Sequence, residues 1–267
     1  MLSYQYHRVL KKIAETTFPH SRIQHFKIEI QPTELKSKHG DYRPHLIRVF
    51  NLSQKVDYTI STALHELAHH CEYSIYGDTG HSKRFYEVFK GLLETAIKMN
   101  IVDYTVIRMQ DNASDLASLE RHFGPVTVTP DLSFVSNETV IKALNSYNCR
   151  KELQERGYFY DKVEKAWGKI ISTDDVESES DYLLQFVSEK DIIKRDLYDL
   201  SFEAIYFVFV SGAYQVKNIL QQNGYFYKVL KSKKGWAKRI ISTDLDSEKT
   251  FLRSISIDEY KVLSSLK

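Results

Sequence analysis

The sequence predicts an α+β protein: a small N-terminal domain with a helix, a short sheet and two further helices, followed by a duplicated small αβ module. Three observations support this prediction. Helical and alternating apolar spacings follow one another within residues 1–105, whereas residues 136–190 and 205–260 repeat one another's motifs. Nine of the ten histidines fall in the first hundred residues, which indicates that the front and the back of the chain have different roles.

The composition is ordinary for a globular protein and excludes several classes. The 267 residues are 42% hydrophobic and 27% charged, and a formal charge of +2 does not indicate a general polyanion binder. Cys71 and Cys149 are too few for a disulfide framework or a four-cysteine zinc ribbon. The longest apolar run, residues 204–210, is too short to span a bilayer, and the first twenty residues lack an apolar signal region. We therefore expect a cytoplasmic protein with no membrane partner.

The first elements follow from their spacing. Residues 4–18 carry apolar side chains at helical intervals and predict an amphipathic helix. Residues 25–31 alternate between apolar and polar side chains and predict a strand that Pro32 ends. The polar stretch 36–44 predicts a loop. Residues 45–52 predict a second strand, apolar on both faces, as expected near the middle of a small sheet.

Two longer helices come next. Residues 57–75 predict a helix with one apolar stripe, which is formed by Ile60, Ala63, Leu64, Leu67, Ala68 and Cys71. The polar, glycine-containing residues 77–80 break it, and residues 85–97 predict a third helix. The stretch 106–135 has weak periodicity and a Gly-Pro breaker at residues 124–125, so we interpret it as a linker.

The back half contains an internal repeat. Residues 150–160 are echoed by 216–227, and the Trp-led run at 167–174 is echoed by 236–244. Each copy predicts a helix, a glycine cap, an aromatic strand, a turn, a Trp-led strand and a short closing helix. Both tryptophans of the chain occupy the same place in the two copies.

The motif that carries chemistry is HExxH, formed by His65, Glu66 and His69 within the predicted helix 57–75. Histidines at i and i+4 project from one helix face, so both imidazoles can reach one zinc ion. Glu66 lies beside that face, where a carboxylate can accept a proton from water activated by the metal. The competing interpretation is that His65 and His69 are ordinary surface residues of the helix.

The third ligand has three candidates. Glu72 lies on the same helix face as His65 and His69, whereas His70 is turned about 100° away from that face. His81 follows the 77–80 turn and opens the next helix, so it can approach the metal from a separate element. Tetrahedral zinc favours such a ligand, because one helix face cannot surround the ion. We favour His81 over Glu72.

The stretch from Leu64 to Phe85, with its HExxH motif and a Gly80-His81 pair four residues before Phe85, resembles the SprT-like zinc metallopeptidases, which include Spartan-type proteases. The resemblance covers roughly residues 1–100. It implies a zincin-like domain over 1–105, Zn²⁺ as cofactor, a protein or peptide substrate, His65, His69 and His81 as ligands, and Glu66 as the catalytic glutamate. The donor to the oxyanion stays open among Tyr42, Tyr73, Tyr86 and Arg84.

The second repeat suggests a further partner. Basic side chains alternate there with aromatic ones, a pattern that suits single-stranded nucleic acid, including DNA. The candidate binding residues are Lys231, Lys233, Lys234, Trp236, Lys238 and Arg239. The alternative is that the aromatic residues form a small core and the lysines a solvated turn.

Two other functions remain open at this stage. The chain could be a non-enzymatic binding protein whose zinc is structural and whose repeats recruit nucleic acid or a protein. It could also be a metal-dependent hydrolase that acts on a small amide. Glu66 favours an enzyme, because a structural zinc site needs no general base.

Overall fold

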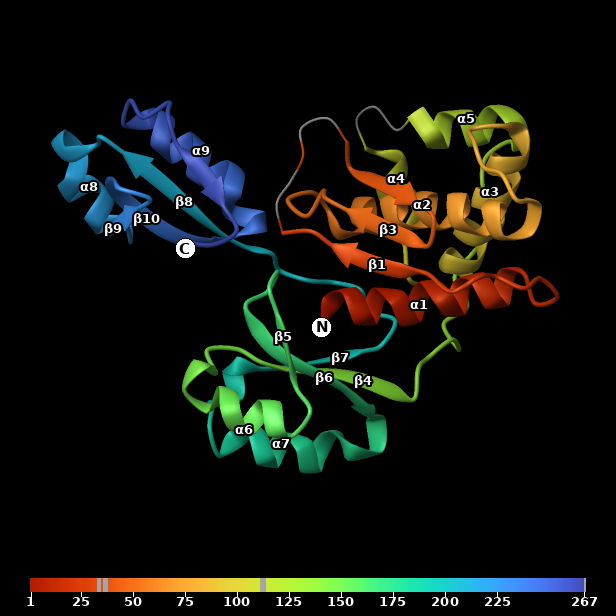
Figure 1. Cartoon of the computed structure of the whole chain (residues 1–267), viewed down its shortest axis with the longest axis horizontal. Coiled ribbons are helices and arrows are strands. Elements are labelled where there is room, and N and C mark those ends of the chain that lie inside the picture. Colours follow the sequence, from red (N-terminus) through yellow and green to blue (C-terminus); the bar gives the residue numbers. More distant parts are fainter. Residues whose placement is uncertain (33–34, 36–37, 111–113, 267) are drawn as a thin grey trace.

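The computed structural model describes residues 1–32, 35, 38–110 and 114–266, and it shows three lobes (Figure 1). The chain is a mixed α+β protein with three small sheets in the described residues. We call the lobes the N-terminal region (residues 1–135), module 1 (residues 138–196) and module 2 (residues 205–263). Within the described residues, no helix combines the length and apolarity needed to cross a membrane.

The N-terminal region contains the helices and strands that its spacing predicts. Its first six elements are α1 (Leu2–Thr17), β1 (Lys27–Ile30), β2 (Gly40–Arg43), β3 (Leu46–Val49), α2 (Val56–Tyr76) and α3 (Lys83–Lys98). The sheet has the order β1-β3-β2, with β3 parallel to β1 and antiparallel to β2. The central place of β3 explains its apolar character, because Ile47 and Val49 are fully buried.

Two parts of this region differ from the sequence prediction. The predicted loop 36–44 contains β2, which forms by pairing with β3 rather than by any apolar alternation of its own. The predicted linker 106–135 contains most of α4 (Tyr104–Arg108) and all of α5 (Ser114–Phe123). Helix α5 buries only Leu116 and Leu119, so its apolar spacing is too sparse to identify a helix. The described residues 106–110 and 114–123 therefore belong to the N-terminal region.

The two modules share one arrangement of strands. Module 1 contains β4 (Glu138–Ala143), α6 (Arg150–Glu155), β5 (Phe159–Asp161), β6 (Ala166–Ser172), α7 (Val176–Leu184) and β7 (Ile192–Asp196). Module 2 contains β8 (Ile205–Ser211), α8 (Lys217–Gln222), β9 (Phe226–Leu230), β10 (Lys233–Ile241), α9 (Leu245–Ser254) and β11 (Lys261–Leu263). The sheet orders are β5-β6-β4-β7 and β9-β10-β8-β11, and all neighbouring strands are antiparallel. Short 3₁₀ turns occupy Tyr147–Cys149, Thr173–Asp175, Glu189–Asp191, Tyr214–Val216 and Ser242–Asp244.

The sequence motifs located only half of these strands. The first strand of each module, β4 and β8, was not predicted, and the last strands, β7 and β11, lie beyond the expected bounds 136–190 and 205–260. These strands carry no repeated motif. The predicted Trp-led strands do lie in matching positions, with Trp167 opposite Ala143 and Trp236 opposite Val210.

The helices cover one face of each module's sheet, and the same polar network anchors them there. In module 1 the Tyr158 hydroxyl donates to Glu179 Oε1 at 2.8 Å, and Lys169 Nζ lies 3.7 Å from that oxygen. In module 2 the Tyr225 hydroxyl donates to Glu248 Oε1 at 2.7 Å, and Lys238 forms an ion pair with the same carboxylate.

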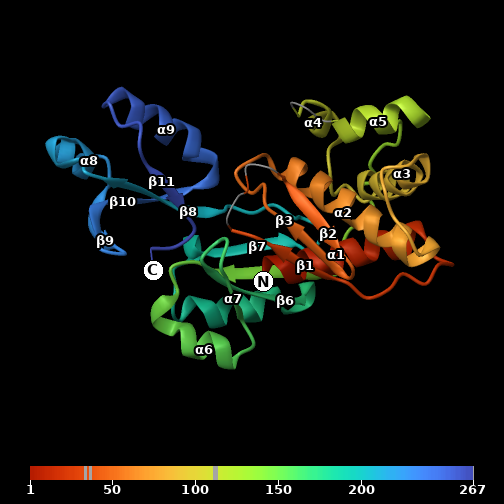
Figure 2. The same ribbon diagram turned by 45° about the horizontal axis from the view of Figure 1, so that its top comes forward.

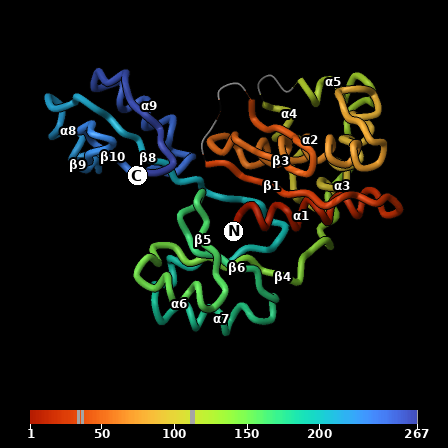
Figure 3. The backbone as a smooth tube through the Cα atoms, viewed as in Figure 1, coloured from red at the N-terminus to blue at the C-terminus, as the bar shows by residue number. Residues whose placement is uncertain are grey.

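Helix α1 lies between the N-terminal sheet and module 1 (Figures 1 and 2). Arg8 forms a bidentate ion pair with Glu138 at 2.7 and 2.6 Å. The Gln5 amide donates to the carbonyls of Leu197 and Asp199 at 3.0 and 2.8 Å. Residues 197–204 then lead from module 1 to module 2, which forms a separate lobe in the backbone trace (Figure 3).

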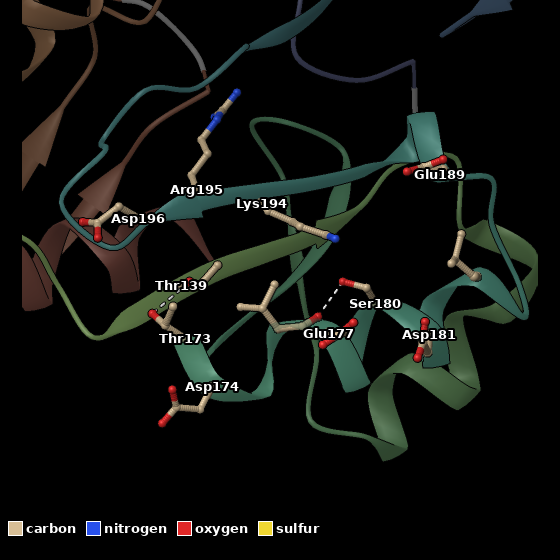
Figure 4. Close-up of a pocket in the computed structure, with 12 residues that line it drawn as sticks. Thr139, Thr173, Asp174, Glu177, Ser180, Asp181, Glu189, Lys194, Arg195 and Asp196 are labelled. Atoms are coloured by element: carbon tan, nitrogen blue, oxygen red, sulfur yellow. Dashed lines mark hydrogen bonds between the residues drawn. The ribbon is translucent and has the colours of Figure 1, made fainter.

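A hollow of about 650 Å³ lies on the helix side of module 1, between β7 and α7 (Figure 4). Its carboxylates Asp174, Glu177, Asp181 and Glu189 are exposed. Lys194 and Arg195 extend to opposite sides of β7, as successive strand residues do. The residues predicted to carry chemistry lie elsewhere.

Candidate metal centre

The end of α2 and the start of α3 position the three histidines. His65 and His69 lie one turn apart on α2, which ends at Gly77 in the left-handed conformation (φ +83°). A residue with a side chain would be strained there, so glycine allows the chain to reverse. Ser82 caps α3 by accepting a hydrogen bond from Phe85 N at 3.3 Å. His81 immediately precedes that cap and is directed back toward α2.

The three imidazoles converge. One nitrogen from each of His65, His69 and His81 lies within 4.8 Å of the others, and the two Nε2 atoms of His65 and His81 are 3.1 Å apart. The ring centroids are separated by 4.9, 5.1 and 4.8 Å, an almost equilateral triangle. Tetrahedral zinc with nitrogen ligands at about 2.05 Å requires ligand atoms roughly 3.3 Å apart. The His65–His81 separation is close to this value, and the three histidines together could hold a metal ion.

Phe85 supports this triangle from α3. Its ring lies 4.3 Å from His69 and 5.0 Å from each of His65 and His81, measured between centroids. Phe85 is itself fully buried. An aromatic ring that contacts all three imidazoles restricts their rotation and holds them close together before any ligand binds.

Glu72 orients the site. Its Oε2 accepts hydrogen bonds from the Thr79 hydroxyl at 2.8 Å and Gly80 N at 3.1 Å, and its Oε1 accepts one from Arg84 at 2.8 Å. Because the only hydroxyl proton of Thr79 goes to Glu72, the contact of 2.8 Å between Thr79 Oγ1 and His69 Nδ1 requires Nδ1 to donate. His69 then keeps its Nε2 lone pair for a metal.

Asp115 is the functional candidate that sequence reasoning missed. It lies on α5, within the stretch interpreted as a linker, and its Oδ2 is 3.3 Å from His65 Nδ1. This Nδ1 atom is buried and makes no aligned hydrogen bond with any described residue. A carboxylate behind a histidine is the usual outer partner of a metal ligand, because it fixes the tautomer and the ring orientation. No apolar pattern could have identified it.

Glu66 lies in a cavity of about 300 Å³ together with His65 and Asp115. The strand β2 passes very close to it: a Cβ on Gly40 would be 2.8 Å from Glu66 Oε1 and 2.7 Å from Thr62 Cγ2. Only glycine allows this approach. Gly40, which the sequence suggested was a loop residue, therefore sets the wall of the cavity beside the carboxylate.

Burial determines the charge state of these groups. It lowers the pKa of His65 to about 4 and that of His69 to about 3, with the neighbouring histidines adding to the effect, so both rings are neutral as metal ligands must be. Burial, together with Asp41 and Asp115, raises the pKa of Glu66 to about 8. A divalent cation on the histidines would favour the carboxylate form of Glu66, because it places positive charge nearby.

Of the other candidates from the sequence, His70 and Arg84 are held by hydrogen bonds, whereas Tyr42 and Tyr73 make ring contacts. His70 is fully buried, and its Nε2 lies 2.9 Å from the Gln24 carbonyl, so it supports the fold behind the site. Arg84 is held by Glu72 and by Asp78 at 2.6 Å, which leaves it no freedom to reach a substrate. Tyr42 and Tyr73 contact each other beside His70, with ring centroids 6.5 Å apart.

Two of the proposed oxyanion donors lie beside the histidines. The Tyr42 ring centroid lies 6.1 Å from that of His69. Tyr86 approaches from α3. Its ring centroid lies 6.4 Å from that of His81. Burial raises the pKa of Asp115, and His81 and a hydrogen bond from Tyr86 partly offset that rise.

The predicted nucleic-acid residues do not form one surface. Lys231, Lys233 and Lys234 are exposed at the β9–β10 turn, and Arg239 is exposed on the sheet face opposite the helices. Trp236 is only 8% exposed, and Lys238 is paired with Glu248 under α9. Both therefore belong to the interior on the helix side, because alternate residues of β10 point to opposite faces.

Comparison of the chain with protein-family models, with curated proteins and with solved structures gave no match.

Proposed function

We propose that this chain is a zinc-dependent metallopeptidase whose metal is bound by His65, His69 and His81. The observation that supports this most strongly is the convergence of the three imidazoles beside a buried glutamate and a cavity. The resemblance of residues 64–85 to SprT-like metallopeptidases agrees with the proposal, as does a zincin-like order of helix, sheet and helices.

Each group of the site has a proposed role in the reaction. Zinc held by neutral imidazoles supplies Lewis acidity and brings the pKa of water toward neutrality. Glu66 accepts the proton of the attacking water and returns it to the departing amine, as a general base and then a general acid. Asp115 and the Glu72–Thr79 pair hold His65 and His69 in the orientation that this requires.

The substrate that suits this cavity is an extended peptide. Strand β2 is at the edge of its sheet, and His39 and Gly40 line the cavity with Glu66. A peptide added to this edge would gain backbone hydrogen bonds and pass beside the carboxylate. We propose Tyr42 or Tyr86 as the hydroxyl that donates to the developing oxyanion.

We also infer that modules 1 and 2 are copies of one unit. The repeated motifs, the identical strand orders and the matching Tyr–Glu–Lys networks support this inference.

Metal content tests the ligand set. Purified protein reconstituted with zinc should hold one ion per chain by elemental analysis, and His81→Ala should lose most of it. His20→Ala removes an exposed histidine outside the site and should retain full content. Absence of zinc from the reconstituted wild type, or full zinc in His81→Ala, would overturn the assignment.

Activity tests the role of Glu66. Wild-type protein should cleave labelled casein in a zinc-dependent manner, and Glu66→Gln should bind zinc while losing at least about a hundredfold in rate. A zinc-loaded Glu66→Gln protein as active as wild type would exclude this general base. Zinc binding without hydrolysis of proteins or small amides would instead favour a structural metal.

A further inference from the structure

The sheet face opposite the helices differs sharply between the modules. Pairing to Trp167 and Trp236 places the two sheets in register, so each position in module 1 has a counterpart in module 2. In module 1 this face carries Glu138, Lys142 and Asp161, and in module 2 the same positions carry Ile205, Phe209 and Lys228.

Helix α1 closes this face in module 1. Arg8 pairs with Glu138, and Asp161 accepts a hydrogen bond from Leu2 N at 2.5 Å. Lys142, only 1% exposed, forms an ion pair with Glu164 beneath the helix. A Cβ on Gly168 would lie 2.8 Å from Met1 Cγ, so glycine is needed where the helix meets the sheet. Where α1 crosses it, this face is part of the interior, whereas Phe159 at its edge is 65% exposed.

The same face in module 2 has no helix across it and is basic. Its charged strand positions, all of which lie in the described part of the chain, are Lys228, Lys233, Arg239 and Lys261. Three of these are exposed, and Lys228 is half-buried. Arg239 and Lys261 occupy the positions that Ile170 and Ile193 occupy in module 1. Module 2 therefore has charged side chains where module 1 has apolar ones.

Aromatic rings lie among these cations. Phe226 on the edge strand is 45% exposed, and Phe207 on the central strand β8 is half-buried. Phe209 lies across Gly235, where a Cβ would come within 2.7 Å of its ring. The glycine therefore allows the Phe209 ring to approach the strand, and Phe226 and Phe207 lie on the same face, opposite Ala237 and Arg239.

The basic surface continues onto module 1. The backbone N–H of Ile205 donates to the Val163 carbonyl at 2.9 Å, which places the β5–β6 turn next to the start of β8. Burial lowers the pKa of Lys165 in this turn, Asp161 partly offsets that effect, and Arg239 adds to the lowering. Tyr160, also affected by Arg239, is 46% exposed.

We propose that this open face of module 2 binds single-stranded nucleic acid, with Phe226 and Phe207 stacking on bases and Lys228, Lys233, Arg239 and Lys261 contacting phosphates. A four-stranded sheet with helices on one face and aromatic side chains on the other is a known platform for unpaired bases. The presence of cations and aromatic rings on one face suits a ligand that carries both flat apolar groups and negative charges. An acidic peptide would satisfy the cations but leave the rings without partners.

The test uses the full chain and fluorescence anisotropy with labelled oligo(dT) and oligo(rU) of about 16 nucleotides. Phe226→Ala should weaken binding about tenfold, because one stacked base is lost. The matched control is Phe159→Ala, at the same edge position of module 1 and 65% exposed, which should bind like wild type. The affinities for oligo(dT) and oligo(rU) show whether the surface prefers DNA or RNA.

Charge is tested separately. Arg239→Glu with Lys261→Glu should weaken binding at least about tenfold and reduce the slope of log affinity against log salt by about 1 to 1.5. Lys151→Glu with Lys190→Glu makes the same change in net charge on exposed sites of module 1 and should have little effect. Circular dichroism of each variant confirms that it is folded.

Several outcomes would overturn the proposal. These are no binding of wild type to either strand at low salt, equal loss in the control variants, or duplex bound as tightly as single strands. Measurements with and without EDTA separate this surface from the metal centre: failure here leaves the metallopeptidase proposal standing, and loss of metal should leave oligonucleotide binding unchanged.

Discussion

Module 1 and module 2 place the same strands in the same order, yet they use one sheet face in opposite ways. Module 1 presents Glu138 and Asp161 to α1 and becomes part of the interior, whereas module 2 presents Lys228 and Arg239 to solvent. On the helix side the two are alike, down to a tyrosine that donates to a glutamate. The fold of such a module is therefore set by its helix side, which leaves the other face free to change its charge and its partner.

The largest effect should come from the buried pair that only module 1 has. Lys142→Ala leaves Glu164 buried, with Arg195 3.7 Å away as its remaining cation. Removing one partner of a buried pair costs about 3–5 kcal/mol of unfolding free energy, measured by urea denaturation. Lys261→Ala on the open face of module 2 should change it by less than about 0.5 kcal/mol. Similar losses in the two variants would contradict the contrast drawn between the faces.

The tyrosine–glutamate hydrogen bond should contribute to stability in both modules. Tyr158→Phe and Tyr225→Phe each remove one hydrogen bond to a buried carboxylate, at a cost of about 1.5–3 kcal/mol. The loss should be the smaller in module 1, because Glu179 keeps a bidentate ion pair with Arg156 as well as Lys169, whereas Glu248 keeps Lys238. Hydrogen exchange resolved by module measures the two losses independently. A larger loss in module 1 than in module 2 would contradict this order.

A single methyl group should distinguish the closed face from the open one. Gly168→Ala forces Met1 and Lys142 to move, which should cost about 1–2 kcal/mol. Module 2 already has Ala237 at this position, so the module itself tolerates the methyl group. Thermal unfolding of Gly168→Ala beside Ala237→Gly measures the difference. An unchanged Gly168→Ala protein would show that α1 does not press on the sheet there.

The smallest effect concerns the ion pair between lobes. Arg8→Ala breaks the bidentate contact with Glu138, but both side chains are about a third exposed, at 35% and 30%. Solvent screening limits the expected loss to below about 1 kcal/mol, and it should shrink as salt is added. A loss above 2 kcal/mol, unaffected by salt, would indicate that packing rather than charge holds α1 to module 1.

The sequence was most informative where periodicity and chemistry coincide. The apolar stripe of α2 places His65 and His69 on one face, and the glycine-containing turn indicates His81 as a partner from another element. Asp115 could not be found this way, because it lies on a helix with only two buried apolar residues. The sequence placed Gly40 in a loop. Its close approach to Glu66 is a tertiary contact, which the neighbouring residues in the sequence do not indicate.

The modules show a second limit of motif reasoning. Grouping cations and aromatic residues by nearness in sequence put Trp236, Lys238 and Arg239 together, although alternate residues of a strand face opposite sides. Pairing places Arg239 with Phe207 on the open face and Lys238 with Val208 under the helices. The strands β4, β8 and their partners had to be known before the two faces could be told apart.

Helix α1 contributes to two interiors at once. It therefore ties module 1 to the N-terminal region. Tyr6, Val9 and Ile13 are fully buried in the N-terminal region, while Gln5 and Arg8 hold module 1. Module 1 could not be deleted without exposing the helix that underlies the histidine centre. Module 2 follows the short segment 197–204, and its core residues Trp236 and Leu245 belong to the same apolar cluster as Tyr6 and Val9, so its removal would expose part of that cluster too.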